Sequence, residues 1–514
     1  MSASAAALAR PADPCCFVIF GASGDLTHRL VFPALYNLAA DGLLPQAFAL
    51  VGVARKEMSG DAFRAGLEKS LGDFATRPVK PEVVRRLLQC VDYVAGDADD
   101  PRAYERLGEA LARIERSRAT LGNRLFYLAT PPDVFAPIGI RLGESGLARE
   151  EGKIWRRLIV EKPFGVDLAS ARALNAKLLG VLGEDQVYRI DHYLGKETVQ
   201  NVLALRFANG LFEPIWNRDH IDHVQITVAE TQAIGGRGRF YDSTGALRDM
   251  VPNHLFQLLS IVAMEPPARF EAAAVRARKT EVLQAVQEQG GADAVRDSVR
   301  AQYRAGRIGG EPIADYREAG DVAPDSATET YVAVKLLVDN WRWAGVPFYL
   351  RTGKALKAQA SEVAIKFKQA PFAMFRDSPV DHLAQNFLVL GIKPCECISL
   401  QFNAKVPGPT VSLAGVQMTF DYEDYFEAAP ATGYETLIYD CMIGDATLFQ
   451  SAAGIEAGWR TVQPLLDAWR AAGARGLATY AAGSEGPEEA RRLLERDGRA
   501  WRPIAPVPRR AHGA

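Results

Sequence analysis

The stretch CCFVIFGASGDL, residues 15–26, joins six apolar residues directly to a glycine-rich turn. A short apolar run that ends at a turn is typical of a strand buried on both faces of a sheet. The residues after the turn carry apolar side chains at helical spacing, with examples at Leu30, Ala34 and Leu38. A strand, a tight turn and a helix in this order predict the opening of a parallel β-α-β sheet.

The rest of the first 160 residues repeats this rhythm. Apolar runs separated by amphipathic helical segments lie at 47–53, 91–95, 124–129 and 157–160. Strands that alternate with helices indicate an α/β domain with a doubly wound parallel sheet, which is a Rossmann-like architecture.

From about residue 200 the pattern changes. A helical run covers 197–208, and helices are expected between 242 and 265 and from 433 to 475. Longer alternating segments, typical of antiparallel strands, begin at residues 223, 330, 362, 396 and 417. We therefore predict an α+β part with a large, mostly antiparallel sheet. The predicted division is a disordered N-terminus (1–14), a Rossmann-like domain (15–185), an α+β domain (186–503) and a frayed tail (504–514).

Composition excludes several classes of function. Lys and Arg total 60 against 62 for Asp and Glu, and the formal charge of −2 gives no reason to expect a nucleic-acid or anionic-membrane partner. No segment approaches the roughly 20 apolar residues of a membrane span, and residues 1–13 do not resemble a signal peptide. The six cysteines are sparse, and none has zinc-finger spacing. We expect a soluble cytoplasmic protein with reduced thiols and no metal.

The glycine turn is a candidate phosphate-binding site. Gly21 and Gly24 allow close approach of a pyrophosphate, and the following helix start supplies backbone amides. The G-x-x-G spacing alone is also compatible with an ordinary tight turn. No Gly-Lys-Ser/Thr follows, so a Walker-type loop is not expected.

The end of the second strand bears on the choice of coenzyme. NAD-binding folds generally place a carboxylate there, whereas this chain has Arg55 and Lys56. A guanidinium suits a 2′-phosphate, which favours NADP and leaves NAD as a weaker acceptor. The alternative is that Arg55 is a solvated surface charge.

Three further segments carry chemistry: EKPFG (161–165), RIDHYLGKE (189–197) and RDMVPNH (248–254). Lys162 follows a strand of the parallel sheet, at the edge where such sheets bind ligands. The residues before the helix at 197 offer a cradle for a phosphate dianion. His254 shares an apolar helical face, which is also typical of a core histidine. Pro252 is expected to start a new turn or kink just before His254.

These segments resemble the glucose-6-phosphate dehydrogenase family. GASGDL, EKPFG, RIDHYLGKE and RDMVPNH occur in that order, and RTGKAL, FNAKVPG, YETLIYDCMIGD, YAAGSEGP and RDGRAW continue the resemblance. It extends from about residue 15 to 503. The string RIDHYLGKE is highly specific.

The resemblance implies a role for each matching residue. His254 is similar to the general base that accepts the sugar's C1 hydroxyl proton, and Asp191 to the carboxylate that orients it. His192, Tyr193 and Lys196 correspond to phosphate-binding residues, and Glu230, Asp249 and Lys354 to sugar contacts. Lys162 corresponds to a lysine between sugar and coenzyme, and Pro163 to a cis-proline. The implied coenzyme contacts are Gly21, Ser23, Gly24, Asp25, Leu26, Arg55 and Lys162.

Three positions depart from the family pattern: Gln359 stands where a basic residue is expected, Lys393 where some members have Gln, and Pro252 where Gln is common. The implied substrate is glucose 6-phosphate, and the implied assembly is a homodimer or homotetramer. Two rival interpretations remain. One is another Rossmann-type sugar oxidoreductase of the Gfo/Idh/MocA kind, and the other is a non-catalytic NADP-binding protein.

Overall fold

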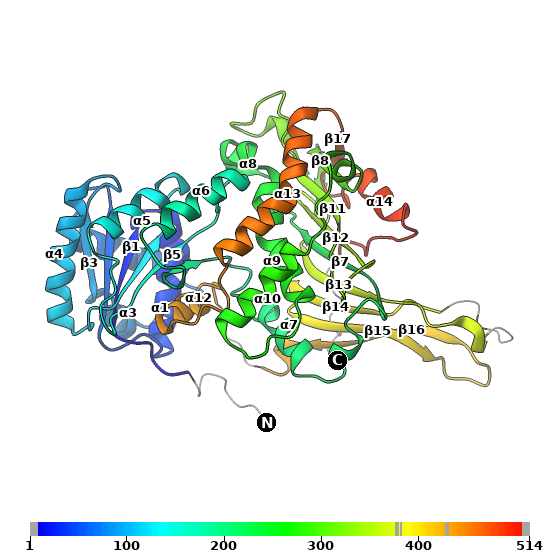
Figure 1. The fold of residues 1–514 in the computed structure, drawn as a ribbon, viewed down its shortest axis with the longest axis horizontal. Coiled ribbons are helices and arrows are strands. Elements are labelled where there is room, and N and C mark those ends of the chain that lie inside the picture. Colours follow the sequence, from blue (N-terminus) through cyan, green and yellow to red (C-terminus); the bar gives the residue numbers. More distant parts are fainter. Residues whose placement is uncertain (1–8, 376–379, 381–382, 427–430, 506–514) are drawn as a thin grey trace. The chain divides into compact units, whose positions relative to one another are not determined.

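The computed structural model describes residues 9–375, 380, 383–426 and 431–505, which form two compact units. The first unit comprises residues 1–196, 267–277 and 427–456. The second comprises 197–266, 278–426 and 457–514. Each unit is organised around its own sheet, and Figure 1 labels many of the elements of each unit.

The first unit contains a six-stranded parallel sheet in the order β3-β2-β1-β4-β5-β6. This is the strand order of a doubly wound dinucleotide-binding fold, and it confirms the predicted Rossmann-like sheet. Its strands are β1 Cys15–Phe20, β2 Phe48–Ala54, β3 Val91–Ala95, β4 Arg124–Leu128, β5 Arg156–Val160 and β6 Val187–Arg189. The helices before β6 are α1 Phe32–Ala40, α2 Gly60–Phe74, α3 Pro81–Leu88, α4 Pro101–Arg118, α5 Phe135–Glu144 and α6 Leu168–Leu179.

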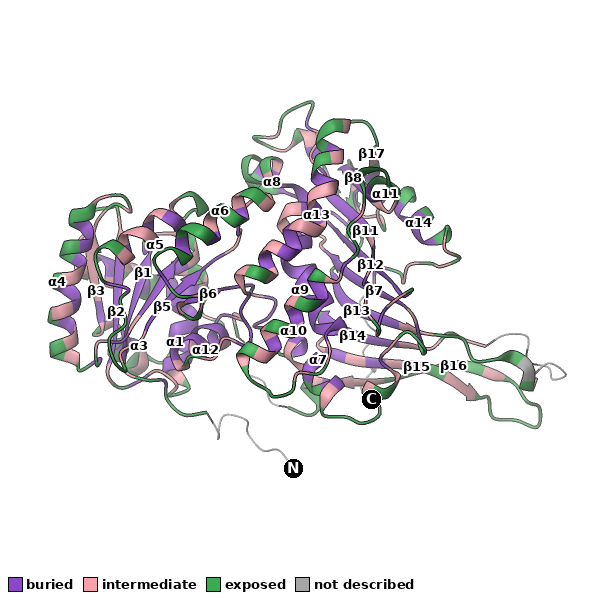
Figure 2. Cartoon of the chain, viewed as in Figure 1, coloured by how far each residue is buried: buried purple, intermediate pink, exposed green. Residues whose placement is uncertain are grey.

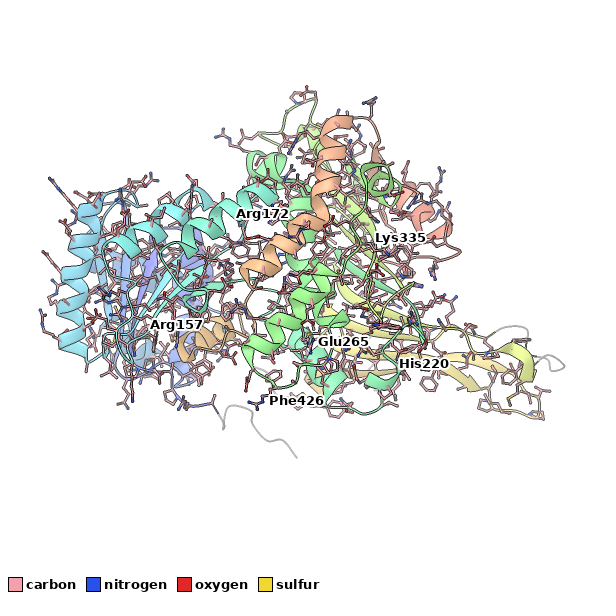
Figure 3. The ribbon with its side chains drawn as sticks, viewed as in Figure 1. Arg157, Arg172, His220, Glu265, Lys335 and Phe426 are labelled. Carbon is pink, nitrogen blue, oxygen red and sulfur yellow. The ribbon has the colours of Figure 1, made fainter. Side chains whose placement is uncertain are left out.

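The first unit ends later in the sequence than residue 185. The short strand β6 pairs with β5 and therefore belongs to the parallel sheet. Residues 431–456, which include α12 Glu435–Ile443, also belong to this unit. Arg157 on β5, labelled in Figure 3, donates to the carbonyls of Cys441 and Met442 at 2.6 and 2.8 Å. An arginine at these last carbonyls caps α12 onto the sheet, a contact that sequence spacing does not reveal.

The chain ends are more ordered than predicted where the structure describes them. The backbone N–H of Ala12 donates to Leu43 O at 2.9 Å, and Ala12 is buried. Ile504 is also buried, so the frayed tail does not begin at 504. Residues 1–8 and 506–514 lie outside the described residues.

The second unit contains a nine-stranded sheet in the order β16-β15-β14-β13-β7-β12-β11-β8-β17. Only the β7–β12 and β8–β17 pairs are parallel, which confirms the mostly antiparallel prediction. The strands are β7 Ile221–Ala229, β8 Ser298–Arg304, β11 Tyr331–Leu337, β12 Pro347–Gly353, β13 Ala360–Phe367, β14 Phe387–Lys393, β15 Cys397–Lys405, β16 Leu413–Asp421 and β17 Leu477–Ala481. A separate two-stranded ribbon consists of β9 Gly306–Ile308 and β10 Glu311–Ile313.

The second unit also contains helices. They are α7 Glu197–Phe207, α8 Gly238–Met250, α9 Phe256–Ala263, α11 Gly291–Arg296 and α14 Glu488–Glu495. The residues of two further helices, α10 Ala272–Gln284 and α13 Ala452–Ala472, are divided between the two units. Every residue of α9 is buried, as the purple ribbon in Figure 2 shows. None of the helices in the described part of the chain is long and apolar enough to cross a membrane. All six cysteines are free thiols, and five of them are buried.

Candidate active site

The glycine turn lies where β1 meets the first helix, at the carboxyl edge of the parallel sheet. Gly21 has φ +83°, and a Cβ there would lie 2.1 Å from Ala129 O. Ala129 follows β4, and the strand order reverses between β1 and β4, which is where such sheets bind ligands. Gly24 N–H donates to Gly21 O at 2.9 Å, and Thr27 Oγ1 donates to the same oxygen at 3.0 Å. These two hydrogen bonds stabilise the turn, and no side chain fits at Gly21. We call residues 21–26 the backbone cradle.

The other predicted coenzyme residues lie around this cradle. Ser23 and Asp25 are exposed, Leu26 is half-buried, and the helix begins at Asp25. Arg55 directly follows β2, the neighbour of β1, and is exposed. An exposed guanidinium beside the turn is available to a ligand on the sheet's carboxyl edge.

Two predicted site residues follow adjacent strands of the same sheet. Lys162 lies two residues after the end of β5, and Asp191 lies two residues after the end of β6. The backbone N–H of Ile190 donates to Val160 O at 2.9 Å, which keeps the two chain segments paired just before these residues. The Lys162–Pro163 peptide bond is cis, as the resemblance implies.

Glu161 is a buried carboxyl group at the end of β5. Tyr127 Oη donates to Glu161 Oε1 at 2.5 Å, and Tyr434 is a second hydrogen-bond partner. Burial raises the pKa of Glu161 from 4.5 to about 7, although both tyrosines and the charge of Lys162 lower it, and Asp191 adds a smaller increase. Desolvation of the charged form outweighs these partners. Sequence reasoning did not single out Glu161, because its burial depends on the packing of residues near 434.

A Glu161→Gln substitution is expected to change how stability depends on pH. A raised pKa favours the folded state fully below pH 4.5, and this contribution is lost as the pH rises through about 7. Glutamine stays neutral, so the variant should gain melting temperature relative to the parent at pH 8.5 but not at pH 5. A change from 4.5 to about 7 corresponds to about 3 kcal/mol. An equal difference in melting temperature at both pH values would show that the pKa of Glu161 is not raised in the folded protein.

The predicted phosphate-binding residues form a compact turn between β6 and α7. Asp191 is 1 % exposed, and its Oδ1 accepts from the Tyr193 backbone N–H at 2.9 Å. Lys196 Nζ lies 3.7 Å from the centroid of the Tyr193 ring, and the His192 and Tyr193 rings are 5.3 Å apart. A Cβ on Gly195 would lie 2.2 Å from Gly433 O, so this turn packs tightly against the segment before α12. The structure thus brings these four predicted residues together.

Glu230 and Lys354 form a second group, in the other unit. They directly follow the parallel strands β7 and β12, and Glu230 N–H donates to Gly353 O at 3.0 Å. The Lys354 ammonium forms an ion pair with Glu230, and its Nζ lies 5.8 Å from the Tyr241 ring centroid. Lys354 is 6 % exposed, so a ligand in reach of this pair would meet a partly desolvated charge.

His254 lies in a π-helical turn, Val251–Leu255, between α8 and α9. The helix changes from α8 to this π-helical turn next to Pro252, where a break was expected. Proline has no backbone N–H, so it cannot donate the helical hydrogen bond to Arg248 O. Asn253 Nδ2 instead donates to Arg248 O at 3.1 Å and to Asp249 O at 3.2 Å. His254 is 1 % exposed, in keeping with its apolar helical face. The Asn253 side chain, next to His254, thus replaces the backbone donor that Pro252 lacks.

The three departures from the family pattern differ in their surroundings. Gln359 and Lys393 are exposed, whereas Pro252 is buried within the turn that carries His254.

The predicted site residues are divided between the two units. The first unit contains the glycine turn, Lys162 and the 191–196 turn. The second unit holds Glu230, Asp249, His254 and Lys354.

Comparison with known proteins decides the family. Residues 18–201 match the model "Glucose-6-phosphate dehydrogenase, NAD binding domain", and residues 203–502 match "Glucose-6-phosphate dehydrogenase, C-terminal domain". The chain belongs to the glucose-6-phosphate dehydrogenase family. It is therefore an oxidoreductase whose first unit is a nucleotide-binding domain.

Individual glucose-6-phosphate dehydrogenases resemble the chain over nearly its whole length. Glucose-6-phosphate 1-dehydrogenase 2 of Mycobacterium tuberculosis is 45 % identical over 495 residues, with 96 % of each chain covered. Glucose-6-phosphate 1-dehydrogenase of Chlamydia pneumoniae is 42 % identical, covering 96 % of this chain and 97 % of its own. A solved glucose-6-phosphate dehydrogenase in complex with glucose 6-phosphate is 33 % identical, with a TM-score of 0.86 and coverage of 96 % and 100 %. The Mycobacterium avium structure is 37 % identical, with a TM-score of 0.80 and the same coverage.

Proposed function

We propose that the chain oxidises C1 of D-glucose 6-phosphate to 6-phosphoglucono-1,5-lactone with NADP⁺ as acceptor, the first step of the oxidative pentose phosphate pathway. The observation that carries this is the turn of His192, Tyr193 and Lys196 in a chain of the glucose-6-phosphate dehydrogenase family. A cationic turn of this kind suits a phosphate dianion, which an unphosphorylated sugar lacks.

In this proposal His254 is the general base. It accepts the proton of the C1 hydroxyl as the C1–H bond breaks and the C1=O bond of the lactone forms. Asp191 orients the imidazole and stabilises its charged form. His192, Tyr193 and Lys196 bind the phosphate, and Glu230, Asp249 and Lys354 bind the sugar hydroxyls. Because the phosphate is remote from C1, its binding energy serves to fix the reacting groups in place.

The residues of the first unit fit a dinucleotide. Gly21 lies so close to Ala129 O that no side chain fits there, and the helix that begins at Asp25 follows the turn directly, so its first amides suit a pyrophosphate. Gly21, Ser23, Gly24, Asp25 and Leu26 would hold the pyrophosphate, Arg55 the 2′-phosphate, and Lys162 would lie between coenzyme and sugar. When bound, NADP⁺ supplies the hydride acceptor.

Arg55→Ala tests the choice of coenzyme. Because removal of a charged hydrogen-bond partner typically costs about 1.5–3 kcal/mol, NADP⁺ binding should weaken by about 10- to 150-fold. Binding of NAD⁺, which lacks the 2′-phosphate, should change little. Dissociation constants for both coenzymes, with the exposed neighbour Lys56→Ala as a matched control, measure this. Equal losses for both coenzymes would contradict a 2′-phosphate role.

We further propose that the protein acts in the cytoplasm as a homodimer or homotetramer, without a metal or nucleic acid. Sedimentation of the purified chain checks the assembly. The rival function, oxidation of a free sugar, is favoured by no observation on the site, because the cationic turn at 192–196 would then have no anionic group to bind. Initial rates with glucose 6-phosphate and free glucose separate the two functions.

A further inference from the structure

The helical segment that carries His254 is held at its amino end by the buried residue Glu329. Gly245 has φ +71°, so α8 is interrupted there and restarts at Ala246. Glu329 accepts from both first amides: its backbone carbonyl from Ala246 N–H and its Oε1 from Leu247 N–H, each at 3.0 Å. A Cβ on Gly245 would lie 2.4 Å from Glu329 Oε1, so the glycine makes room for this contact. Glu329 is 6 % exposed, and carboxyl and carbonyl oxygens that accept from these amides suit the amino end of a helix.

The carboxyl end of the same segment is held by three side chains from elsewhere in the unit. Arg206 Nη1 donates to Ile261 O at 3.0 Å, Trp216 Nε1 to Val262 O at 2.8 Å, and Trp343 Nε1 to Ala263 O at 2.8 Å. We call Arg206, Trp216 and Trp343 the α9 clamp. Three consecutive carbonyls that an ending helix leaves without backbone partners are thus each given a donor.

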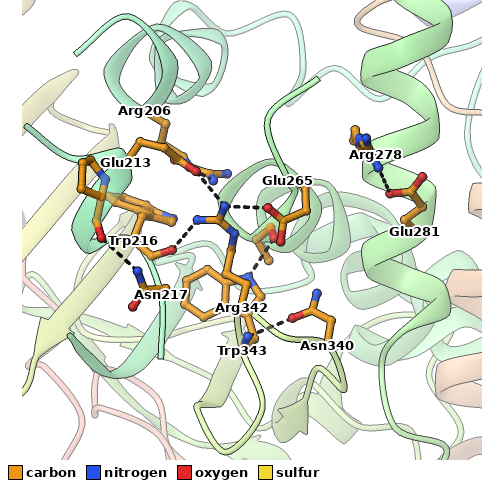
Figure 4. Close-up of polar contacts among 12 residues, drawn as sticks. Arg206, Glu213, Trp216, Asn217, Glu265, Arg278, Glu281, Asn340, Arg342 and Trp343 are labelled. Atoms are coloured by element: carbon orange, nitrogen blue, oxygen red, sulfur yellow. Dashed lines mark hydrogen bonds and ion pairs between the residues drawn. The ribbon is translucent and has the colours of Figure 1, made fainter. Parts of the chain in front are cut away.

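The α9 clamp is itself held by a network of charged side chains, shown in Figure 4, in which Arg206 is buried and its partners are partly exposed. Glu213 bridges two arginines, with Oε2 3.1 Å from Arg206 Nη2 and Oε1 2.8 Å from Arg342 Nη2. Arg342 also donates to Trp216 O at 2.7 Å and pairs with Glu265 at 2.6 Å. Each member of the clamp is fully buried. This arrangement leaves the end of α9 little freedom to move.

The clamp also connects α9 to the helix that follows the phosphate-binding turn. Arg206 lies in the last turn of α7, and α7 begins at Glu197, the residue after Lys196. The hydrogen bond from Arg206 to Ile261 O therefore links α9 to α7, the helix that directly follows the phosphate-binding residues in the chain.

We propose that Arg206, Trp216 and Trp343 are positioning residues for the reaction: by holding the carboxyl end of α9, they fix the placement of His254 relative to the substrate. The inference rests on the proposed role of His254 as base. A displacement of reacting groups by about 1 Å can cost about 100-fold in rate, so modest loosening of α9 should be visible in turnover.

Trp343→Phe and Trp216→Phe test this, because each keeps an aromatic ring and removes one donor to α9. Trp501→Phe is the matched control, since Trp501 Nε1 also donates to a backbone carbonyl, that of Ala490, at 2.8 Å in the same unit. The measurements are turnover per folded molecule, the Michaelis and dissociation constants for glucose 6-phosphate, and the isotope effect with substrate deuterated at C1. Melting temperature is recorded for all three variants.

We expect the clamp variants to lose about 5- to 50-fold in turnover, with the substrate dissociation constant changed less than about 2-fold. The deuterium isotope effect on turnover should increase, because C1–H cleavage becomes more rate-limiting. Trp501→Phe should lower the melting temperature without changing turnover or the isotope effect. The Trp216→Phe, Trp343→Phe double variant should lose more turnover than either single variant.

Clamp variants that lower only the melting temperature, as Trp501→Phe does, would overturn the positioning role. If both clamp variants fail to fold, Arg206→Lys retains the buried charge and still tests the contact with Ile261 O; normal turnover and isotope effect in that variant would also overturn it. Failure of the positioning role leaves the base assignment intact, since that assignment is tested separately by His254→Asn.

Discussion

His254→Asn is expected to lower turnover with glucose 6-phosphate by about 10²- to 10⁴-fold while the protein remains folded. A positioned base contributes about this much, and asparagine cannot accept the C1 hydroxyl proton at neutral pH. Substrate affinity should stay close to that of the parent, because the phosphate and sugar contacts are on other residues. Turnover and thermal unfolding of the same preparation provide the measurement.

The two interpretations of His254 differ in which quantity changes. His254 is 1 % exposed, which is also typical of a histidine that only fills the core. In that case the melting temperature should fall, and turnover per folded molecule should remain near normal. Asp191→Asn serves as a comparison and should lose less turnover than His254→Asn, because the imidazole remains but is less well oriented. Near-normal turnover in well-folded His254→Asn would remove the catalytic assignment.

Lys196→Ala is expected to lower kcat/KM for glucose 6-phosphate by about 150-fold, mostly through the Michaelis constant. Loss of a charged hydrogen-bond partner costs up to about 3 kcal/mol. The upper end applies because Lys196 is half-buried and lies over the Tyr193 ring, which holds the ammonium in place. Oxidation of free glucose, measured at high concentration, should hardly change.

Lys357→Ala is a suitable control for Lys196→Ala. Lys357 is an exposed lysine that forms an ion pair with Glu485, and it belongs to no predicted site. It should leave both substrates' kinetics unchanged. A Lys196→Ala variant in which free glucose suffers as much as glucose 6-phosphate would show a structural or catalytic role instead of phosphate binding.

Much of the fold could be predicted from local pattern. The strand at 91–95 has the predicted bounds, and the helix predicted over 197–208 ends one residue earlier, because apolar periodicity reports directly on these elements. In the nine-stranded sheet, strands β8, β12, β14 and β17 were not predicted. β12 is buried along its whole length but contains Arg351, Thr352 and Gly353, so its sequence does not alternate as a half-exposed strand does. Its place in the sheet depends on partners far away in the chain.

The candidate site was predictable where it depends on motifs and not where it depends on packing. The turn at 191–196 and the cis bond before Pro163 occur where the resemblance implies them. Glu161, Glu329 and the α9 clamp were missed, because each acts through residues at least 34 positions away in the sequence that only the folded chain brings near. Asn253 could have been suggested, since Pro252 removes a backbone donor and the next side chain can replace it.

The most direct test of the proposed function is initial-rate kinetics of the purified protein with glucose 6-phosphate and with free glucose, each with NADP⁺ and with NAD⁺. We predict rapid NADPH formation with glucose 6-phosphate, release of the lactone in equal amount, and a lower kcat/KM with NAD⁺. Free glucose should be oxidised with a kcat/KM at least about 100-fold lower, since it lacks the group that the 192–196 turn binds. Comparable efficiency with free glucose, or no oxidation of glucose 6-phosphate with either coenzyme, would contradict the proposal.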